Sequence, residues 1–333
     1  MYQITKDAGQ QMSRTAVLTV HYNSIEDTKR CADSLSVLRD IPLLVVVDNS
    51  SQESNVENAL VGYPNLEIIR SGENLGFGRG NNLGIRWILS NTDCEFIFLL
   101  NNDAIVKPDT IALLEEAMDA FPEAGIVSPR IVFMENPNLL WYGGGSINWY
   151  RGKGKVPGYL GPADTKSART HREGTFISGC AMFIRRTVLE QVGGFDPRFF
   201  MYEEDLELCL RVQKAGWGLR YVAEPKVLHK VQASKREEGD VYLSPRDPRN
   251  PSLPFFMYHM TKNRLLNMYM HARGMNALRF LIGFSLFLVM DCVRYALAGR
   301  WDALVSASEG FASFVSGRNQ VCVTDVEKTF IDT

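Results

Sequence analysis

Alternation between short apolar runs and helix-like segments is the feature that most constrains the fold of this 333-residue chain. Four apolar runs have the length and composition of buried strands, at 16–21, 43–47, 66–70 and 96–100. Three segments with helical spacing alternate with them or follow them, at 27–38, 81–90 and 109–120. Continuous apolar strands separated by helices are typical of a parallel sheet that helices cover on both faces. The first half of the chain is therefore predicted to form an α/β fold.

The second half of the chain is less regular. A stretch rich in glycine, tryptophan and tyrosine at 141–161 predicts loops and a hairpin. A further strand is expected at 175–184 and a helix at 204–215. Prolines and charged residues at 235–254 indicate an exposed, mobile loop, and helical spacing returns over 255–299.

Charge and cysteine content limit the partners and the compartment. Lys plus Arg (36) nearly balance Asp plus Glu (38), so no overall basic field argues for nucleic acid as a partner. The six cysteines are scattered without a CxxC pair, which favours reduced thiols over a disulfide framework or a zinc site. The N-terminal segment is polar and lacks the apolar core of a signal peptide. We therefore expect a cytoplasmic protein.

Polar residues directly follow two of the predicted strands. Asp48 comes after the second strand, and Asn101, Asn102 and Asp103 come after the fourth. In open α/β sheets, ligands bind beyond the carboxyl ends of the strands, so these residues are the first candidates for a site. A carboxylate at such a position can accept hydrogen bonds from a ligand or bind Mg²⁺ or Mn²⁺. The alternative for each is a turn or a helix cap.

A glycine-rich segment lies between these two positions. Residues 74–84 contain four glycines, which let the backbone approach a ligand closely, and Arg79 can offset phosphate charge. The segment is not a GxGxxG fingerprint, and by itself it is weak evidence for a phosphate site.

Two further candidates lie in the second half. Glu203, Glu204 and Asp205 follow an aromatic run and precede an apolar helix. Acids there either complement the helix dipole or, against aromatic rings, have a raised pKa that suits a general base. His229 follows an apolar segment and is a metal candidate only if Asp103 lies nearby; a surface histidine is the alternative.

Taken in chain order, five segments resemble glycosyltransferase family 2, and in particular its bacterial rhamnosyltransferase-like branch. They are AVLTVHYN at 16–23, VVVDNSS at 45–51, ENLGFGRGNNLGI at 73–85, FLLNNDAIVKPD at 98–109 and GGFDPRFFMYEEDLELCLRVQKAGW at 193–217. The resemblance covers residues 14–270 and implies a GT-A fold, in which a Rossmann-like, mostly parallel sheet is flanked by helices. It implies a nucleotide-binding half at 14–125 and an acceptor half at 126–270, leaving 271–333 as a helical C-terminal extension.

The resemblance also implies roles for single residues on the nucleotide side. The matching positions are Tyr22, Asn23, Asp48, Asn74, Gly76, Arg79, Asn81, Asn102 and Asp103. Asp48 would bind the base of the nucleotide. Asn101, Asn102 and Asp103 stand where the family has its DXD-type motif, and because the first acid is replaced by Asn, Asp103 must make the metal contact.

Catalytic and acceptor residues are implied in the same way. Asp205, beside Glu204, matches the catalytic base, and His229 matches the histidine that completes the metal site with Asp103. The acceptor side would include Trp141, Gly179 and Cys180. Lys262, Asn263 and Arg264 resemble a family element to which we assign no role at this point.

The implied activity is that of a metal-dependent, inverting hexosyltransferase that uses Mg²⁺ or Mn²⁺. The branch favours rhamnose from dTDP-rhamnose as the donor and a hydroxyl of a cell-surface polysaccharide or lipid-linked glycan as the acceptor. The alternatives are a UDP-sugar-dependent enzyme of the same family and a non-catalytic sugar-binding protein of the same fold. A nucleotidyltransferase would have a basic, glycine-rich signature near the N-terminus, where this chain reads HYNSIEDT.

One apolar run remains outside this scheme. Residues 280–290 read FLIGFSLFLVM and carry no charge. The run is shorter than the stretch of about 20 apolar residues that crosses a membrane, and Arg279 and Asp291 flank it. Either it packs against the rest of the protein or a second copy, or the locally basic segment 271–300 rests on an anionic membrane surface.

Overall fold

The computed structural model describes residues 13–50, 54–231 and 243–317. Most of the polar N-terminal segment, part of the predicted loop at 235–254, and Cys322 lie outside the described residues. Within them, the other five cysteines are free.

The four strands predicted in the first half are confirmed. They are β1 (Thr15–His21), β2 (Leu43–Asp48), β3 (Leu66–Arg70) and β4 (Phe96–Leu100). They pair in parallel in the order β4-β1-β2-β3, with His21 opposite Asp48 at the carboxyl end. The helices of this half are α1 (Ile25–Ser36), α2 (Val56–Ala59), α3 (Gly76–Asn91) and α4 (Thr110–Ala120). The predicted helix at 81–90 starts earlier, at Gly76, so the glycine-rich segment forms the first turns of α3.

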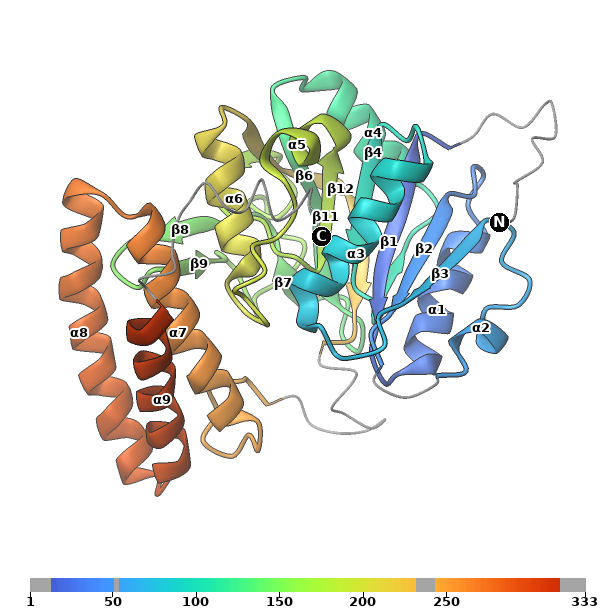
Figure 1. Cartoon of the computed structure of the whole chain (residues 1–333). Coiled ribbons are helices and arrows are strands. Elements are labelled where there is room, and N and C mark those ends of the chain that lie inside the picture. The colour runs from blue at the N-terminus through green and yellow to red at the C-terminus, as the bar shows by residue number, and fades with distance from the viewer. Residues whose placement is uncertain (1–12, 51–53, 232–242, 318–333) are drawn as a thin grey trace.

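Glycine in α3 allows the helix to lie close to its neighbours. A Cβ atom on Gly84 would lie 2.2 Å from Leu18 Cδ1 in β1, and one on Gly80 would lie 3.1 Å from Val20 Cγ1. Helix α3 therefore packs directly on the strands that it covers (Figure 1).

The second half extends the sheet with both parallel and antiparallel strand pairs. Its strands are β6 (Ala124–Phe133), β7 (Leu140–Tyr142), β10 (Arg172–Gly174), β11 (Ala181–Arg185) and β12 (Gly218–His229). A short strand of the first half, β5 (Ala104–Val106), pairs antiparallel with β12. The sheet order is β10-β12-β6-β11-β4-β1-β2-β3, and β11 joins the halves by pairing antiparallel with both β4 and β6. The predicted hairpin is formed by β8 (Ser146–Asn148) and β9 (Lys153–Lys155). The α/β class, with a sheet flanked by helices, is confirmed.

The strand predicted at 175–184 is wrong in its first half, because β11 starts only at Ala181. The amide of Ile177 donates to Cys209 Sγ, and that of Gly179 donates to Asp205 Oδ2. Both acceptors are side chains of α6 (Glu204–Lys214). Two backbone donors of this segment are thus satisfied by a helix instead of a neighbouring strand.

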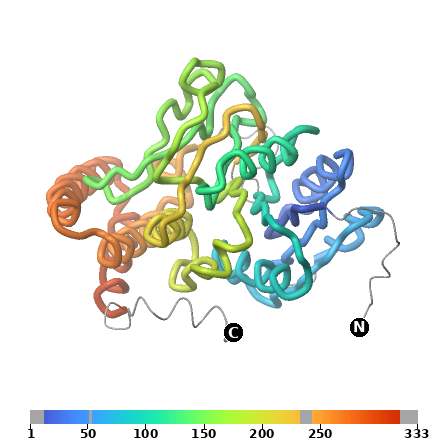
Figure 2. The backbone as a smooth tube through the Cα atoms, turned by 90° about the horizontal axis from the view of Figure 1, so that it is seen from above, coloured from blue at the N-terminus to red at the C-terminus, as the bar shows by residue number. Residues whose placement is uncertain are grey.

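The short helix α5 (Arg186–Val192) and α6 lie between β11 and β12 in the chain. Three long helices follow β12. They are α7 (Leu253–His271), α8 (Gly274–Leu297) and α9 (Trp301–Gly317). They lie together at one side of the molecule, and β3 lies at the other side (Figures 1 and 2). The hairpin β8–β9 reaches them: a Cβ atom on Gly283 of α8 would lie 2.0 Å from the carbonyl oxygen of Tyr150. The helices are therefore packed onto the second half of the sheet domain.

Helix α8 carries the apolar run of 280–290 and is mostly exposed. Within it only Phe280, Gly283 and Tyr295 are buried, and 17% of its most apolar window is covered. The helix has 24 residues with a window hydropathy of 1.8, so by length and composition it could cross a membrane. The expectation that the segment is too short therefore holds only for the charge-free run, not for the whole helix.

Candidate functional site

The carboxyl ends of the parallel strands border a cleft with a volume of about 490 Å³. Most of the residues predicted from the sequence line it: Tyr22, Asn74, Gly76, Asn81, Asn102, Asp103, Trp141, Gly179 and His229. They come from loops after β1 and β4, from the start of α3, from β7, from the segment before β11 and from the end of β12. Segments far apart in the chain thus share one concave surface, as the strand order requires.

Asp103 and His229 lie together at the floor of this cleft. Asp103 Oδ1 is 3.1 Å from His229 Nε2, and both side chains are buried. Trp141 packs edge-on against the His229 ring with 4.7 Å between ring centroids. Burial by itself lowers the pKa of His229, but the Asp103 carboxylate and the Cys180 thiol outweigh it, so the pKa is well above the usual value. Because Asp103 lies beside it, His229 meets the condition stated for a metal candidate.

The donor set of this pair suits a divalent cation. Carboxylate oxygen and imidazole nitrogen both bind Mn²⁺, and Mg²⁺ or Mn²⁺ in phosphate-handling sites takes few protein ligands and fills the rest with phosphate and water oxygens. In the described ranges, no group of three His, Cys, Asp or Glu side chains could hold a metal. A cation here would therefore depend on oxygens from a bound substrate.

The glycine-rich start of α3 is tied to the end of β2 through Asn49. Asn49 Oδ1 accepts from the amide of Leu75 at 2.9 Å, and its Nδ2 donates to Asn74 Oδ1 at 3.1 Å. Gly76 has a φ of 77°, and a Cβ atom there would lie 2.2 Å from the carbonyl oxygen of Phe200. Only glycine fits this position without a backbone shift. Asn49 was not among the predicted site residues, although it follows Asp48 directly.

Three residues predicted on the nucleotide side do not line the cleft. Asp48 is buried behind its rim, where Oδ1 accepts from the amide of Ser50 and Oδ2 from the Ser54 hydroxyl at 2.6 Å. Arg79 is half-exposed and lies 3.9 Å from Glu73 Oε1. Asn23 is exposed with a left-handed φ of 64°. Residues 51–53, beside Asp48, are outside the described part of the chain. The nucleotide-binding roles of these residues stay predictions.

Glu204 and Asp205 form the first turn of α6, beside the cleft. Asp205 Oδ2 accepts from the amide of Gly179, which lines the cleft, at 3.0 Å, and Oδ1 accepts from the amide of Leu206. Burial raises the pKa of Asp205 to about 6 against the effect of these amides. Burial, and next the charge of Asp205, raises the pKa of Glu204 well above its usual value. A carboxylate with a pKa near 6 is a stronger base than a free one and is still ionised at neutral pH.

The turn before this acid pair is held by α7. Tyr202 and Glu203 both have left-handed φ angles, 71° and 70°, which are unfavourable for residues other than glycine. Asn263 Nδ2 donates to the carbonyl of Tyr202 at 2.8 Å, and Asn267 Nδ2 donates to that of Glu203 at 2.9 Å. The segment at 262–264, to which we assigned no role from its sequence, therefore supports through Asn263 the turn that presents Glu204 and Asp205.

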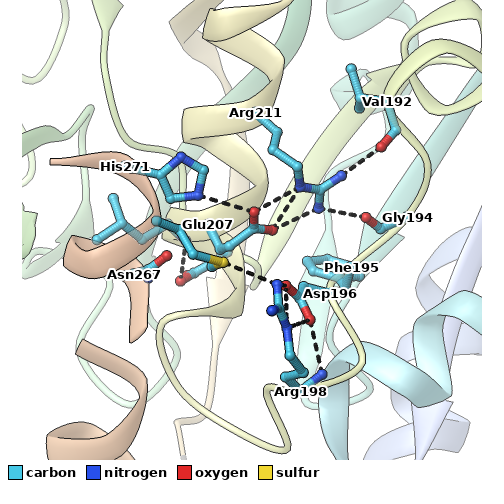
Figure 3. Close-up of polar contacts among 12 residues, drawn as sticks. Val192, Gly194, Phe195, Asp196, Arg198, Glu207, Arg211, Asn267 and His271 are labelled. Carbon is cyan, nitrogen blue, oxygen red and sulfur yellow. Dashed lines mark hydrogen bonds and ion pairs between the residues drawn. The ribbon is translucent and has the colours of Figure 1, made fainter. Parts of the chain in front are cut away.

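A buried ion-pair network anchors the next turn of α6 (Figure 3). Glu207, which is 1% exposed, accepts two hydrogen bonds from Arg211 Nε at 2.8 Å and a third from Arg211 Nη2 at 2.7 Å. His271 Nε2 lies 3.2 Å from Glu207 Oε1, and Arg211 also donates to the carbonyls of Val192 and Gly194. The network joins α6 to the end of α7 and to the segment after α5.

Cys180 lies behind the cleft and does not line it. The side chain is buried, and its carbonyl accepts from the amide of Asn101 at 2.9 Å. The cleft wall includes other residues that sequence reasoning missed: Tyr159, Met201, Tyr202, Ser244 and Pro245. These residues lie in loops, and no motif or periodicity in the sequence distinguishes them.

The fold is shared with a solved glycosyltransferase. The mannosyltransferase PcManGT from Pyrobaculum calidifontis, solved in complex with GDP-Man and Mn²⁺, matches with a TM-score of 0.52 and 14% identity over 96% of this chain and 79% of that one. An identity of this size shows the fold alone, which is of the GT-A type. The sequence model described as glycosyltransferase like family 2 matches residues 15–244, and the chain belongs to this family.

Relatives of known role are found in bacteria and archaea. The N-acetylglucosaminyl-diphospho-decaprenol L-rhamnosyltransferase of Mycobacterium tuberculosis is 30% identical over 237 residues, 64% of this chain and 75% of the relative. The low-salt glycan biosynthesis hexosyltransferase Agl10 of Haloferax volcanii is 27% identical over 71% of this chain and 73% of its own. Further relatives named as rhamnosyltransferases match at 25% to 27% identity.

Proposed function

We propose that this glycosyltransferase moves rhamnose from dTDP-rhamnose to a hydroxyl of a lipid-linked glycan or a growing cell-surface polysaccharide, with inversion at the anomeric carbon. The observation that carries the proposal is the meeting of two acidic elements at one cleft. Asp103 and His229 lie at its floor, and Asp205 binds the amide of Gly179 in its wall. A candidate metal-binding pair and a candidate general base thus border one cleft that can hold a sugar.

The donor and acceptor are favoured by the relatives. Several carry rhamnosyltransferase names, and the mycobacterial one is named for a polyprenyl diphosphate acceptor. The hexosyltransferase Agl10 has a similar identity, so a UDP-linked or other hexose donor is the second candidate.

The cation proposal rests on the ligand chemistry of Asp103 and His229 and on the Mn²⁺ bound to the mannosyltransferase of the same fold. When bound, Mg²⁺ or Mn²⁺ would offset the charge that develops on the leaving diphosphate. Trp141, packed against the His229 ring, would hold the imidazole in place.

Asp205 would act as the general base. Its carboxylate would take the proton of the acceptor hydroxyl while the oxygen attacks the anomeric carbon from the face opposite the diphosphate, and this single displacement inverts the configuration. The amides of Gly179 and Leu206 would orient the carboxylate for this step. Cys180 would take no covalent part.

The test is a panel of nucleotide sugars assayed by product mass spectrometry, with the variant Asp205→Asn as the diagnostic. We expect one donor to be consumed and the variant to bind dTDP normally while transfer falls by about 10²–10⁴-fold. Near-normal turnover by the folded variant would refute the base assignment. Affinity for a nucleotide sugar without turnover by the wild-type protein would favour a non-catalytic sugar-binding protein instead.

We also propose that α8 rests on the inner face of the cell membrane, as a peripheral contact through 271–300. Leu281, Leu286 and Val289 are each more than 60% exposed, and Arg273, Arg279, Arg294 and Arg300 lie along or beside the helix. Exposed apolar residues flanked by arginines suit an anionic lipid surface.

Vesicle sedimentation tests this contact with a matched pair of variants. Val289→Glu places a charge on α8, and Val61→Glu places the same charge at an exposed valine far from it. We expect only Val289→Glu to weaken binding to phosphatidylglycerol vesicles. Equal binding by both variants would refute the membrane contact.

A further inference from the structure

Four cationic side chains gather beside the cleft, where the sheet domain meets the C-terminal helices. Arg151 and Lys153 come from the β8–β9 hairpin, Arg246 from the loop before α7, and Arg264 from α7. They belong to segments that are far apart in the chain, and no sequence motif joins them. None of them is among the predicted donor or metal residues. We call them the cationic cluster.

Among the described residues, two carboxylates form ion pairs with members of the cationic cluster. Arg246 Nη2 lies 3.2 Å from Asp291 Oδ2 in α8, and Arg264 Nη2 lies 3.5 Å from Glu203 Oε1. Burial, as the largest effect, raises the pKa of Glu203 to about 7, which weakens it as a counter-charge at neutral pH. Within the described part of the chain, four cations paired with two carboxylates leave a local excess of positive charge, although the chain as a whole is slightly acidic.

Unused hydrogen-bond donors point to a missing anion. Arg264 is 7% exposed, and among the described residues its Nε has no hydrogen-bond partner; the same holds for Arg151 Nε. A buried guanidinium donor without a partner is costly, so a native structure normally supplies an acceptor. Burial first, and then the other three cations, lower the pKa of Lys153 to about 8. An anion placed among the four would reverse this mutual repulsion.

The cationic cluster connects two features already described. Arg246 follows Ser244 and Pro245, which line the cleft, and Arg264 pairs with Glu203, whose chain neighbours are Glu204 and Asp205. On the other side, the guanidinium of Arg151 stacks at 4.0 Å over the ring of Phe287 in α8. The cluster thus lies between the candidate base and the helix with the exposed apolar face.

We propose that Arg151, Lys153, Arg246 and Arg264 bind the diphosphate of a lipid-linked acceptor, with its hydrocarbon chain directed toward α8. This assignment rests on the proposed function and adds the acceptor's binding group to it. A diphosphate also occurs in the nucleotide donor, but the predicted donor residues lie at the carboxyl ends of β1, β2 and β4, whereas the cluster is built from the hairpin, the loop before α7 and α7 itself. Contact with an apolar helix favours the lipid-linked source.

Binding of farnesyl diphosphate, a short prenyl diphosphate, tests the proposal without any transfer reaction. Isothermal titration calorimetry is carried out on the full chain with farnesyl diphosphate, farnesol and dTDP. The diagnostic variants are Arg151→Gln and Lys153→Gln, which avoid the buried Arg264. The matched control is Lys155→Gln, an exposed lysine of the same strand as Lys153. Circular dichroism shows that each variant is folded.

We expect the wild-type protein to bind farnesyl diphosphate more tightly than farnesol. Each diagnostic variant should lower the affinity for farnesyl diphosphate by about tenfold or more, while the affinity for dTDP stays unchanged. If Lys155→Gln weakened farnesyl diphosphate binding equally, the binding would reflect general charge attraction. If the diagnostic variants weakened dTDP binding equally, the cationic cluster would belong to the donor site. Either result overturns the proposal. The absence of farnesyl diphosphate binding to the wild-type protein would overturn it as well. If no nucleotide sugar is consumed but these binding results hold, the proposed function fails and the diphosphate site stands.

Discussion

Replacing Glu207 by glutamine should destabilise the protein by about 3 kcal/mol. Burial opposes ionisation of Glu207, but Arg211 and His271 outweigh it and lower the pKa of the carboxyl from 4.5 to about 2. Each pKa unit corresponds to about 1.4 kcal/mol between the charged and neutral forms, so this difference is worth about 3 kcal/mol. Glutamine keeps the shape but leaves Arg211 buried without its counter-charge.

Urea unfolding at pH 7 measures this loss, with Glu190→Gln as the control. Glu190 also pairs with an arginine four residues away on a helix, but its side chain is 47% exposed, whereas that of Glu207 is 1% exposed. Because water screens the exposed pair, we expect the control to cost about 0.5 kcal/mol or less. A loss below about 1 kcal/mol for Glu207→Gln would refute the reasoning from burial.

The pH dependence of stability gives an independent check on Glu207. A carboxyl whose folded pKa lies below its unfolded value stabilises the native state above the unfolded pKa. This contribution is present above pH 4.5 and is lost as the pH falls toward about 2. The difference in unfolding free energy between wild type and Glu207→Gln should therefore shrink over that window, and a constant difference would contradict the shifted pKa.

Three further predictions concern activity. Since burial raises the pKa of Asp205 to about 6, kcat/KM should fall about tenfold per pH unit below that value, and a profile that stays level down to pH 5 would exclude Asp205 as the base. Chelation with EDTA should abolish transfer and Mn²⁺ should restore it, and Asp103→Asn should raise the Mn²⁺ concentration needed; full activity in chelator would exclude the metal. Asp48→Ala should weaken dTDP binding in calorimetry by about tenfold with little effect on kcat, and unchanged affinity would restrict Asp48 to its observed turn with Ser50 and Ser54.

Local patterns in the sequence were sufficient for the parallel part of the fold. The run that became β4 was bounded correctly because a buried parallel strand is apolar throughout and ends at polar residues. The strand β3 was also bounded correctly, although it is only partly buried and contains Glu67 and Arg70. The same rule correctly predicted that Asp103, just after β4, lies in the cleft. Its contact with His229, 126 positions later in the chain, followed only from the family resemblance, because no periodicity relates the two residues.

Features that depend on side chains from distant elements were not predictable. The strand expected at 175–184 has apolar residues and high strand propensity, but the amides of Ile177 and Gly179 bind side chains of α6, so tertiary contacts override the local preference. The cationic cluster has the same origin: Arg151 and Arg264 look like ordinary surface charges until packing of the hairpin on the helices brings them together. The exposure of α8 was also undetermined, because an apolar helix can cover a core or a membrane.

Helix α7 supports the turn at Tyr202 and Glu203. This support limits which C-terminal segments can be exchanged between this enzyme and its relatives. The family match ends at residue 244, which suggests a natural place to exchange C-terminal segments between relatives. Asn263 and Asn267, however, lie beyond that point and hold the strained backbone that leads into the acid pair. A chimaera joined at 244 that lacked these two amides would keep every residue of the acid pair and lose the backbone geometry that orients it. Helix α7 therefore has to be exchanged together with the turn that leads into the acid pair.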